Sequence, residues 1–333
     1  MKLKKEYAIL LLVIVALAAY LFLRTDDQTS YEIPRLDAVE NNQINRLVVT
    51  KNQKRIELRK ADEQWVVGPK AYAADSIKVS NMVRSAAGLT LTALVSESKS
   101  YERYGLGEEQ KLHVEAFAGK EKVRDFFVGR RAPTQQHTFV TLAGNPNVYH
   151  ARGSIDVTFG HTIDELRDET VLKFEKSDIV VVTLNRGDQS ATFTRKEKVK
   201  EEKEASADSK AAEAPGPEFE WVDSDGNPVK TADVDRLIAH FADLKCDDYL
   251  ADDAKEGLKA PLWTVTLKSD QSTHYLSLYD KENQESIEFP AAASGSAYAF
   301  ILHKTRVENF EKSIDKLLPA KSPATENQAK KGS

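Results

Sequence analysis

The sequence predicts an α+β fold made of two tandem repeats, preceded by a single transmembrane helix. One observation is that the same order of motifs occurs twice, over about residues 44–167 and about residues 178–318. A second is that residues 7–23 form an uncharged, strongly apolar run. Within each repeat several strands precede one long helix, which favours a mainly antiparallel sheet. Each sheet is expected to pack against one long and one short helix.

Both repeats contain the same motifs in the same order. Each opens with an apolar strand, continues with a strand that carries a tryptophan, and then has an Ala-Asp pair, an amphipathic helix and a Gly-Leu pair. The matched residues are Trp65 and Trp221, Asp75 and Asp233, and Gly105 and Gly257. Requirements of a fold recur in a duplicated unit, whereas a single active site usually does not, so we assign all six a structural role.

The residue types suggest what those roles are. Each tryptophan is a predicted core residue where a sheet meets its helix, with a ligand-stacking surface as the alternative. Asp75 and Asp233 are predicted carboxylates at helix N-termini, where a cap or dipole partner stabilises by about 0.5–2 kcal/mol. Thr231 is a second capping candidate in the second repeat.

Hydrophobic spacing predicts the individual elements. Apolar residues at three- and four-residue steps predict long helices over 74–91 and 231–246, and short helices are expected over 155–167 and 306–317. Apolar runs and alternation predict strands. In the first repeat these lie near 44–50, 54–59, 64–67, 111–118, 123–129, 137–142 and 147–151. In the second they lie near 178–184, 190–195, 219–222, 262–268, 273–279, 285–289 and 297–302.

Composition along the chain predicts its organisation. The expected parts are a cytoplasmic basic head at 1–6, the anchor at 7–23, a polar tether at 24–43, repeats at 44–170 and 171–318, and a tail at 319–333. An insertion at 196–218 interrupts the second repeat. It has almost no large apolar side chains to offset its ordering entropy, so it is predicted to be disordered, and so is the tail.

The N-terminal run predicts the location of the chain. A helix over residues 7–23 extends about 26 Å, enough for a thin bilayer core. The three lysines before it predict a cytoplasmic N-terminus at a bacterial inner membrane, with the bulk of the chain in the periplasm. A cleaved signal peptide is the alternative, since Ala16-Leu17-Ala18 has the small-x-small form of a cleavage site. Both interpretations export residues 25 onward.

Charge and cysteine content exclude some classes. The net charge is -5, and lysine and arginine are interleaved with acids, which argues against nucleic acid as a partner. The single cysteine, Cys246, cannot form an internal disulfide. We interpret it as a small, half-buried apolar residue near the end of a helix.

No motif in the sequence carries chemistry. There is no Gly-rich phosphate loop, nucleophile elbow or zinc motif. Residues 223–227 resemble the start of a calcium loop, but Pro228 and Val234 stand where glycine and glutamate are needed, so a turn is predicted. His161 and the acids after it fit an exposed helix face. We therefore predict no enzyme activity, no catalytic or metal-binding residue and no cofactor.

Several short motifs resemble a known family. They are Gln64-Trp65-Val66, Ala74-Asp75, Tyr104-Gly105-Leu106, Phe127-Val128-Gly129, Phe139-Val140 and Val148-Tyr149, followed by the stretch from Asp164 to Ile179. Together they resemble the bacterial family called domain of unknown function 4340, over most of residues 44–250. The resemblance implies a membrane-anchored envelope protein. Some members are encoded beside ABC transporter permeases, including relatives of gliding-motility auxiliary components, and the resemblance implies no catalytic residues.

These observations lead to an expected function. We expect a non-enzymatic, membrane-anchored periplasmic interaction or accessory module for an ABC-type transport system. Its expected partners are the lipid bilayer, through residues 7–23, and a transporter permease. The alternative is an envelope module that binds glycan or peptidoglycan, suggested by the exported location and by Tyr101, Tyr104 and Tyr149.

Overall fold

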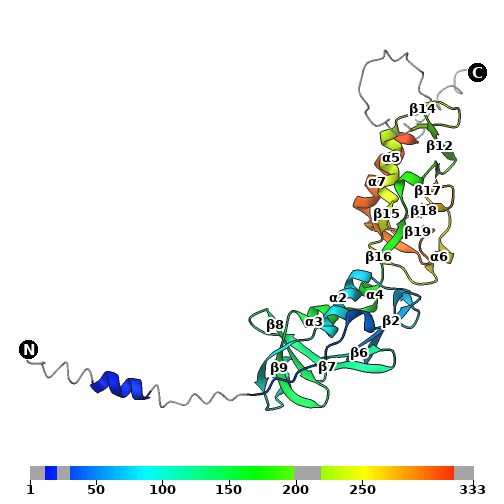
Figure 1. Ribbon diagram of the computed structural model, residues 1–333. Coiled ribbons are helices and arrows are strands. Elements are labelled where there is room, and N and C mark those ends of the chain that lie inside the picture. Colours follow the sequence, from blue (N-terminus) through cyan, green and yellow to red (C-terminus); the bar gives the residue numbers. More distant parts are fainter. Residues whose placement is uncertain (1–11, 21–30, 199–218, 319–333) are drawn as a thin grey trace, which may run out of the picture. The chain divides into compact units, whose positions relative to one another are not determined.

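The protein is described from a computed structural model, which covers residues 12–20, 31–198 and 219–318 (Figure 1). The chain divides into two compact units, residues 1–167 and 168–333, and each unit is considered by itself. The predicted tail and all but the first residues of the predicted insertion lie outside the described residues.

Unit 1 contains a nine-stranded antiparallel sheet. Its strand order is β4-β3-β2-β1-β6-β7-β8-β9-β5. The strands are β1 (Arg46–Lys51), β2 (Lys54–Ala61), β3 (Gln64–Val67), β4 (Tyr72–Ala73), β5 (Leu91–Ser96), β6 (Leu112–Ala118), β7 (Glu121–Arg131), β8 (His137–Leu142) and β9 (Asn145–Arg152). Short 3-10 turns, η1 (Asn41–Gln43) and η2 (Tyr101–Tyr104), precede β1 and follow β5.

Helices cover one face of this sheet. The helix α2 (Ser76–Ala87) buries Val79, Met82 and Ala86, which the sequence placed on one side by three- and four-residue steps. The helices α3 (Ile155–Phe159) and α4 (Ile163–Leu166) stand where one short helix was predicted. The core lies between the helices and the strand residues that point towards them.

Unit 2 contains a second nine-stranded antiparallel sheet. Its order is β14-β13-β12-β11-β17-β18-β19-β20-β16. The strands are β11 (Val181–Arg186), β12 (Gln189–Glu197), β13 (Phe219–Val222), β14 (Pro228–Val229), β16 (Asp248–Tyr249), β17 (Trp263–Lys268), β18 (Thr273–Leu278), β19 (Glu288–Ala293) and β20 (Phe300–His303). The helices are α5 (Thr231–Phe241), α6 (Ala254–Gly257) and α7 (Lys304–Leu317). A 3-10 turn, η3 (Lys176–Asp178), and a small sheet of β10 (Thr170–Lys173) with β15 (Asp243–Lys245) complete the unit.

The two large sheets have the same topology. In each, four consecutive strands run outward from the centre to one edge, and four later strands run outward to the other. The strand that lies beyond the last of these, β5 in unit 1 and β16 in unit 2, comes earlier in the chain than they do. A helix follows the fourth strand in both units. The fold is therefore mainly antiparallel β with some helices, and the similar sheets indicate an internal repeat.

The described part of the N-terminal region is helical over residues 12–20. The anchor was predicted over residues 7–23, and the rest of that range lies outside the described residues. Among the helices that the structure describes, none has both the length and the apolar character needed to span a membrane.

Candidate functional site

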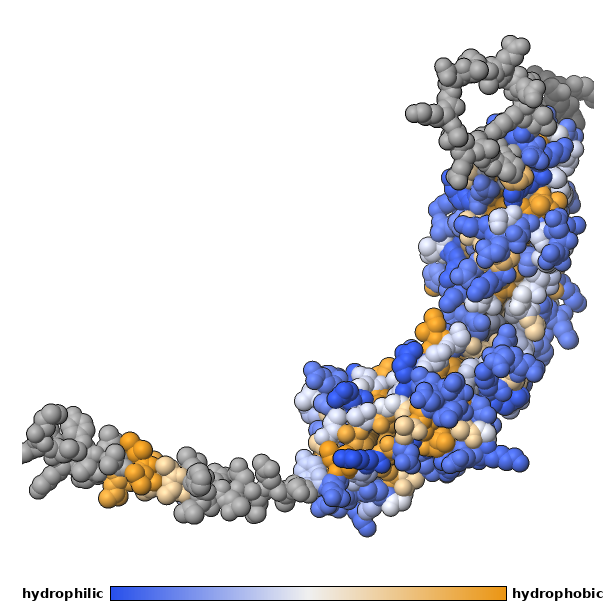
Figure 2. All heavy atoms as spheres, viewed as in Figure 1, coloured by the Kyte–Doolittle hydropathy of each residue, from blue (hydrophilic) through white to orange (hydrophobic). Residues whose placement is uncertain are grey.

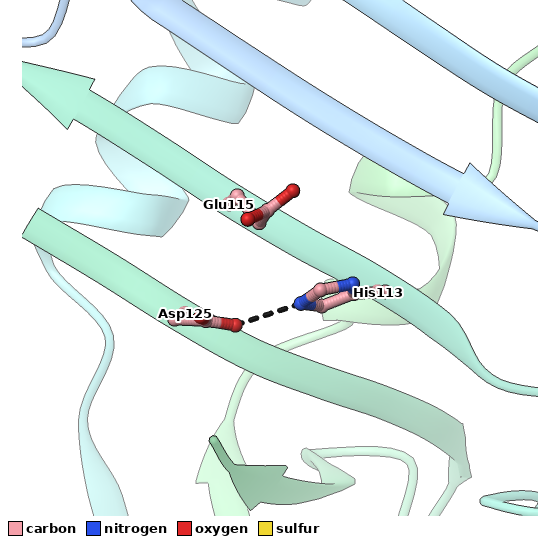
Figure 3. Close-up of side chains that lie close together, drawn as sticks. All are labelled: His113, Glu115 and Asp125. Atoms are coloured by element: carbon pink, nitrogen blue, oxygen red, sulfur yellow. Dashed lines mark hydrogen bonds and ion pairs between the residues drawn. The ribbon is translucent and has the colours of Figure 1, made fainter. Parts of the chain in front are cut away.

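The face of the unit 1 sheet opposite α2 carries a cluster of ionisable side chains. Strand alternation turns Leu112, Val114 and Ala116 of β6 into the core. The residues between them, His113 and Glu115, therefore project from the other face. The adjacent strand β7 supplies Asp125, which pairs directly with Glu115, and Figure 3 shows the three side chains gathered between the two strands.

Lys122 joins these groups into one network, which we call the His113 cluster (His113, Glu115, Lys122 and Asp125). The Nε2 atom of His113 lies 2.7 Å from Oδ1 of Asp125 (Figure 3). The Nζ atom of Lys122 lies 2.7 Å from Oε1 of Glu115 and 2.7 Å from Oδ2 of Asp125. Each carboxylate thus faces a cation or a ring nitrogen.

The His113 cluster includes a possible set of metal ligands. Ligand atoms of His113, Glu115 and Asp125 all lie within 4.8 Å of one another, and imidazole with carboxylates suits several divalent metals. However, the Lys122 ammonium already contacts both carboxylates at 2.7 Å, where a cation would sit. A metal ion would have to displace that ammonium, so the geometry fits an internal ion-pair network better than a metal centre.

The network shifts the protonation of its members. Burial tends to raise the pKa of Asp125, but hydrogen bonds from Lys122 and His113, together with their charges, lower it below its ordinary value. The same contacts, with Asp125 first and Glu115 second, raise the pKa of Lys122 to about 12. At neutral pH the carboxylate of Asp125 and the ammonium of Lys122 are therefore both charged.

The lowered pKa of Asp125 predicts how pH affects unit 1. Because the folded pKa lies below the unfolded value, the stabilisation is complete above the unfolded value of about 3.9 and is lost as pH falls through the folded value. In the Asp125→Asn variant this component is absent. We expect the variant to be less stable than the original chain near neutral pH, with the difference narrowing in acid. Hydrogen exchange of unit 1 peptides measures it, unit 2 peptides are the internal control, and a difference that grows in acid would contradict it.

An aromatic side chain beside the cluster contacts a ring and a cation. The ring of Phe127 stacks on His113 with 4.4 Å between centroids, and the Nζ atom of Lys111 lies 4.6 Å from the same ring. Phe127 also lines an open groove of about 440 Å³ together with Tyr101 and Leu106. The ring of Phe127 is thus already in contact with two side chains of the protein.

Residues from three of the family-like motifs form a separate packing cluster on this face. Tyr104 and Leu106 pack with Phe139 and Val148, and the rings of Tyr104 and Phe139 lie 4.9 Å apart. Gly129 of β7 lies so close below that a Cβ there would be 2.3 Å from the Tyr104 carbonyl oxygen. These motif residues therefore hold the segment after β5 onto the sheet.

The two predicted tryptophans occupy equivalent positions. Trp65 pairs with Lys60 of β2, and Trp221 pairs with Arg195 of β12. Trp221 is buried, and its Nε1–H donates to Oδ1 of Asp235 at 3.1 Å. Trp65 is only partly buried and packs against the unit 1 core. Both side chains belong to the packing between sheet and helix.

Both aspartates lie at helix N-termini, as predicted, but at different helical positions. Asp75 caps α2, because its Oδ1 accepts from the backbone N–H groups of Ile77 and Lys78. Asp233 lies inside the first turn of α5, whose N-cap residue is Lys230 without a side-chain cap. Asp233 instead pairs with Arg236 at 3.1 Å, and Thr231 is the first helical residue rather than the cap. The Ala-Asp pairs of the two repeats therefore fall at different positions relative to the start of the helix.

The two predicted glycines also differ. Gly105 has a φ of 67°, and a Cβ there would lie 2.8 Å from the backbone nitrogen of Arg130, so both its conformation and its space require glycine. Gly257 is exposed at the end of α6, and a Cβ there would meet nothing within 4 Å. The structural role predicted for Gly257 is therefore not supported by its surroundings.

Other residues singled out in the sequence have local roles. Asp223 accepts hydrogen bonds from Asp225 and Asn227 within a turn, as predicted. Cys246 is buried, rather than half-buried, and burial raises the pKa of its thiol to about 11. Two of the three tyrosines, Tyr104 and Tyr149, are buried. The sequence did not lead us to predict the His113 cluster. The signal for it is that His113-x-Glu115 and Lys122-x-x-Asp125 lie on either side of one turn.

Comparisons with known proteins place the chain in a family. The model of the family described as domain of unknown function (DUF4340) matches residues 65–261, which is more than half of the chain. A search of curated proteins and a search of solved structures each give no match. The match begins in β3 of unit 1 and ends before β17 of unit 2, so it draws on both sheets, and the chain belongs to the DUF4340 family.

Proposed function

We propose that the protein is a non-enzymatic interaction module, held at the bacterial inner membrane by its N-terminal segment and auxiliary to an ABC-type transport system. The observation that carries the proposal is the duplicated sheet, in which the matched tryptophans serve packing. Duplicated scaffolds present surfaces to partners, and function on them lies in particular surface sites.

The ionisable groups of the described residues support a non-enzymatic role. Both carboxylates of the cluster around His113 already contact its own Lys122. The buried thiol of Cys246 has a raised pKa, which disfavours the reactive thiolate. The groove beside Tyr101 and Phe127 is open to solvent. We infer that the surface is used for contact.

The N-terminal helix supports attachment to a membrane. Large apolar side chains on residues 12–20 are exposed, among them Leu12 at 71% and Val15 at 59%. Figure 2 shows them as an orange stretch between residues drawn in grey. Exposed apolar surface of this kind is unfavourable in water and favourable in a lipid bilayer. The family resemblance supplies the partner class, an ABC transporter subunit.

The location can be tested with introduced cysteines. Cys246 is buried with a raised pKa, so it gives little background labelling. Lys120→Cys and Gly257→Cys each place a thiol at an exposed site, one in each unit. We expect both to react with a membrane-impermeant maleimide in intact cells whose outer layers have been permeabilised. Labelling that requires lysis of the inner membrane would overturn the proposed location.

The partner can be tested by purification from membranes. The tagged full-length chain, extracted in mild detergent, is expected to retain a permease or ATPase subunit. A chain with residues 7–23 replaced by an unrelated apolar span is the control that separates the units from the anchor. Recovery of the chain alone would contradict the proposal, and turnover in a broad substrate screen would contradict the non-enzymatic role. Retention on isolated cell-wall material would instead favour the glycan-binding alternative.

A further inference from the structure

The four edges of the two large sheets are unequal. Among the described residues, three edge strands are two residues long: β4 (Tyr72–Ala73) in unit 1, and β14 (Pro228–Val229) and β16 (Asp248–Tyr249) in unit 2. The fourth, β5 (Leu91–Ser96), has six residues. Short edges, prolines and charges are the devices by which proteins prevent edge-to-edge pairing. The strand β5 lacks these three, although it carries two bulges, which are another such device.

The free side of β5 offers unpaired backbone groups. β5 pairs with β9 on one side, and no backbone hydrogen bond joins its other side to any part of the chain that the structure describes. Its sequence, Leu-Thr-Ala-Leu-Val-Ser, has neither a charge nor a proline. Such an uncharged edge favours association with another extended chain.

The repeat provides an internal comparison. Sheets of the same topology place β5 and β16 at the same edge, next to β9 and β20. Unit 2 closes this edge with the two residues of β16, so the fold itself does not require a six-residue strand there. The longer edge strand is therefore particular to unit 1, and its explanation must lie in that unit rather than in the shared fold.

The surroundings of β5 define what it would bind. A groove of about 1010 Å³ lies at its start, lined by residues 31–36 and 89–91. Ile33, Pro34 and Leu36 are apolar, and Glu32 and Arg35 are charged. In strand addition the backbone supplies affinity and such pockets supply specificity. Bulges between Leu91 and Ala93, and between Leu94 and Ser96, interrupt regular pairing, so the added strand should be short.

Resting on the proposed role as an interaction module, we propose that β5 is the docking edge for a short, uncharged, extended segment of a partner polypeptide. The segment adds a strand to the unit 1 sheet beside β5 and places an apolar side chain in the groove at Ile33 and Leu36. An extended polypeptide is the ligand that matches a row of alternating N–H and C=O groups.

Ala93 and Ala73 offer a matched pair of positions for the test. Ala93 is a half-buried residue of β5, and Ala73 is an exposed residue of β4, on the opposite edge of the same sheet. In the full-length chain in native membranes, photoreactive benzoylphenylalanine replaces each in turn. We expect position 93 to form an adduct with a different polypeptide and position 73 to form none. In the complex, amide exchange of β5 should slow by about tenfold or more, because its free N–H groups become bonded.

A charge at the edge provides the second arm. Ala93→Lys should reduce the recovered partner by about tenfold or more, because the charge must be desolvated beside the added strand, whereas Ala73→Lys should leave recovery unchanged. Exchange in α2 shows whether either variant disturbs the fold. The proposal would be overturned by adducts to lipid or to a second copy of this chain, by equal labelling at both positions, or by no adduct at position 93. Undiminished recovery of the partner with Ala93→Lys would also overturn it. If a partner is recovered and Ala93→Lys does not reduce its recovery, only the docking edge is excluded. If no partner is recovered at all, the proposed function is contradicted as well.

Discussion

Replacing Gly129 with alanine is expected to destabilise unit 1 by about 3 kcal/mol, which corresponds to roughly a hundredfold faster amide exchange through global opening. The added Cβ would lie 2.3 Å from the carbonyl oxygen of Tyr104 and 2.8 Å from Cγ of Leu106. A backbone oxygen cannot rotate away as the end of a flexible side chain can. The segment that carries Tyr104 must therefore lift from the sheet, exposing Leu106 and Phe139.

Hydrogen exchange followed by mass spectrometry reports the two units separately. Peptides from β6 to β9 should lose protection in Gly129→Ala, while peptides from unit 2 should not change. The matched control is Gly257→Ala, because a Cβ at Gly257 meets nothing within 4 Å, and such surface changes usually stay within about 0.5 kcal/mol. Equal, small effects of the two substitutions would show that the contact below Tyr104 does not hold the segment.

Much of the fold follows from local patterns in the sequence. Trp65 and Trp221 were matched by their strands alone, and the structure pairs them equivalently with Lys60 and Arg195. Asp75 and Asp233 both lie at helix N-termini, but one is a cap and the other lies in the first turn, because the helices α2 and α5 begin at different distances from those residues. A repeat can thus be recognised from strand order while individual residues remain out of register.

The strand β5 was not predicted, and the helix before it was predicted to run through residue 91. The helix ends at Ala87 instead, and β5 begins at Leu91. The segment lacks period-two alternation because two bulges shift its pairing with β9. The edge on which the further proposal rests could not be found from periodicity.

One further bulge explains why the His113 cluster could not be predicted. The hairpin of β6 and β7 pairs Ala118 with Glu121 and Phe117 with Lys122, so simple counting would place Glu115 opposite Arg124. The register shifts beyond Phe117, and Glu115 pairs with Asp125 instead. Because a shift of one residue exchanges the two faces of a strand, Asp125 points away from the core and Arg124 points into it.

Arg124→Met is the second substitution with a large expected effect, a loss of about 3 kcal/mol from the stability of unit 1. The guanidinium is buried. It donates to the carbonyl oxygens of Ala86 at 3.2 Å and Ala87 at 3.1 Å, at the end of α2, and to that of Asp37 at 2.5 Å. The last carbonyls of a helix have no partners within the helix, and their dipole favours a cation. Methionine keeps most of the volume but leaves these acceptors buried without a donor.

The chemistry of the side chain sharpens this prediction. Burial lowers the pKa of Arg124, while the nearby Asp37 opposes the shift; a guanidinium stays charged under such conditions. Arg124→Lys should recover only part of the loss, because a single ammonium cannot reproduce the planar fork that reaches four carbonyls, that of Val123 among them. Arg59→Met, at an exposed position on β2, is the matched control and should change stability by no more than about 0.5 kcal/mol. Exchange of α2 amides measures all three, and full recovery with lysine would mean that charge at the helix end, rather than the shared hydrogen bonds, stabilises this junction between helix, sheet and N-terminal segment.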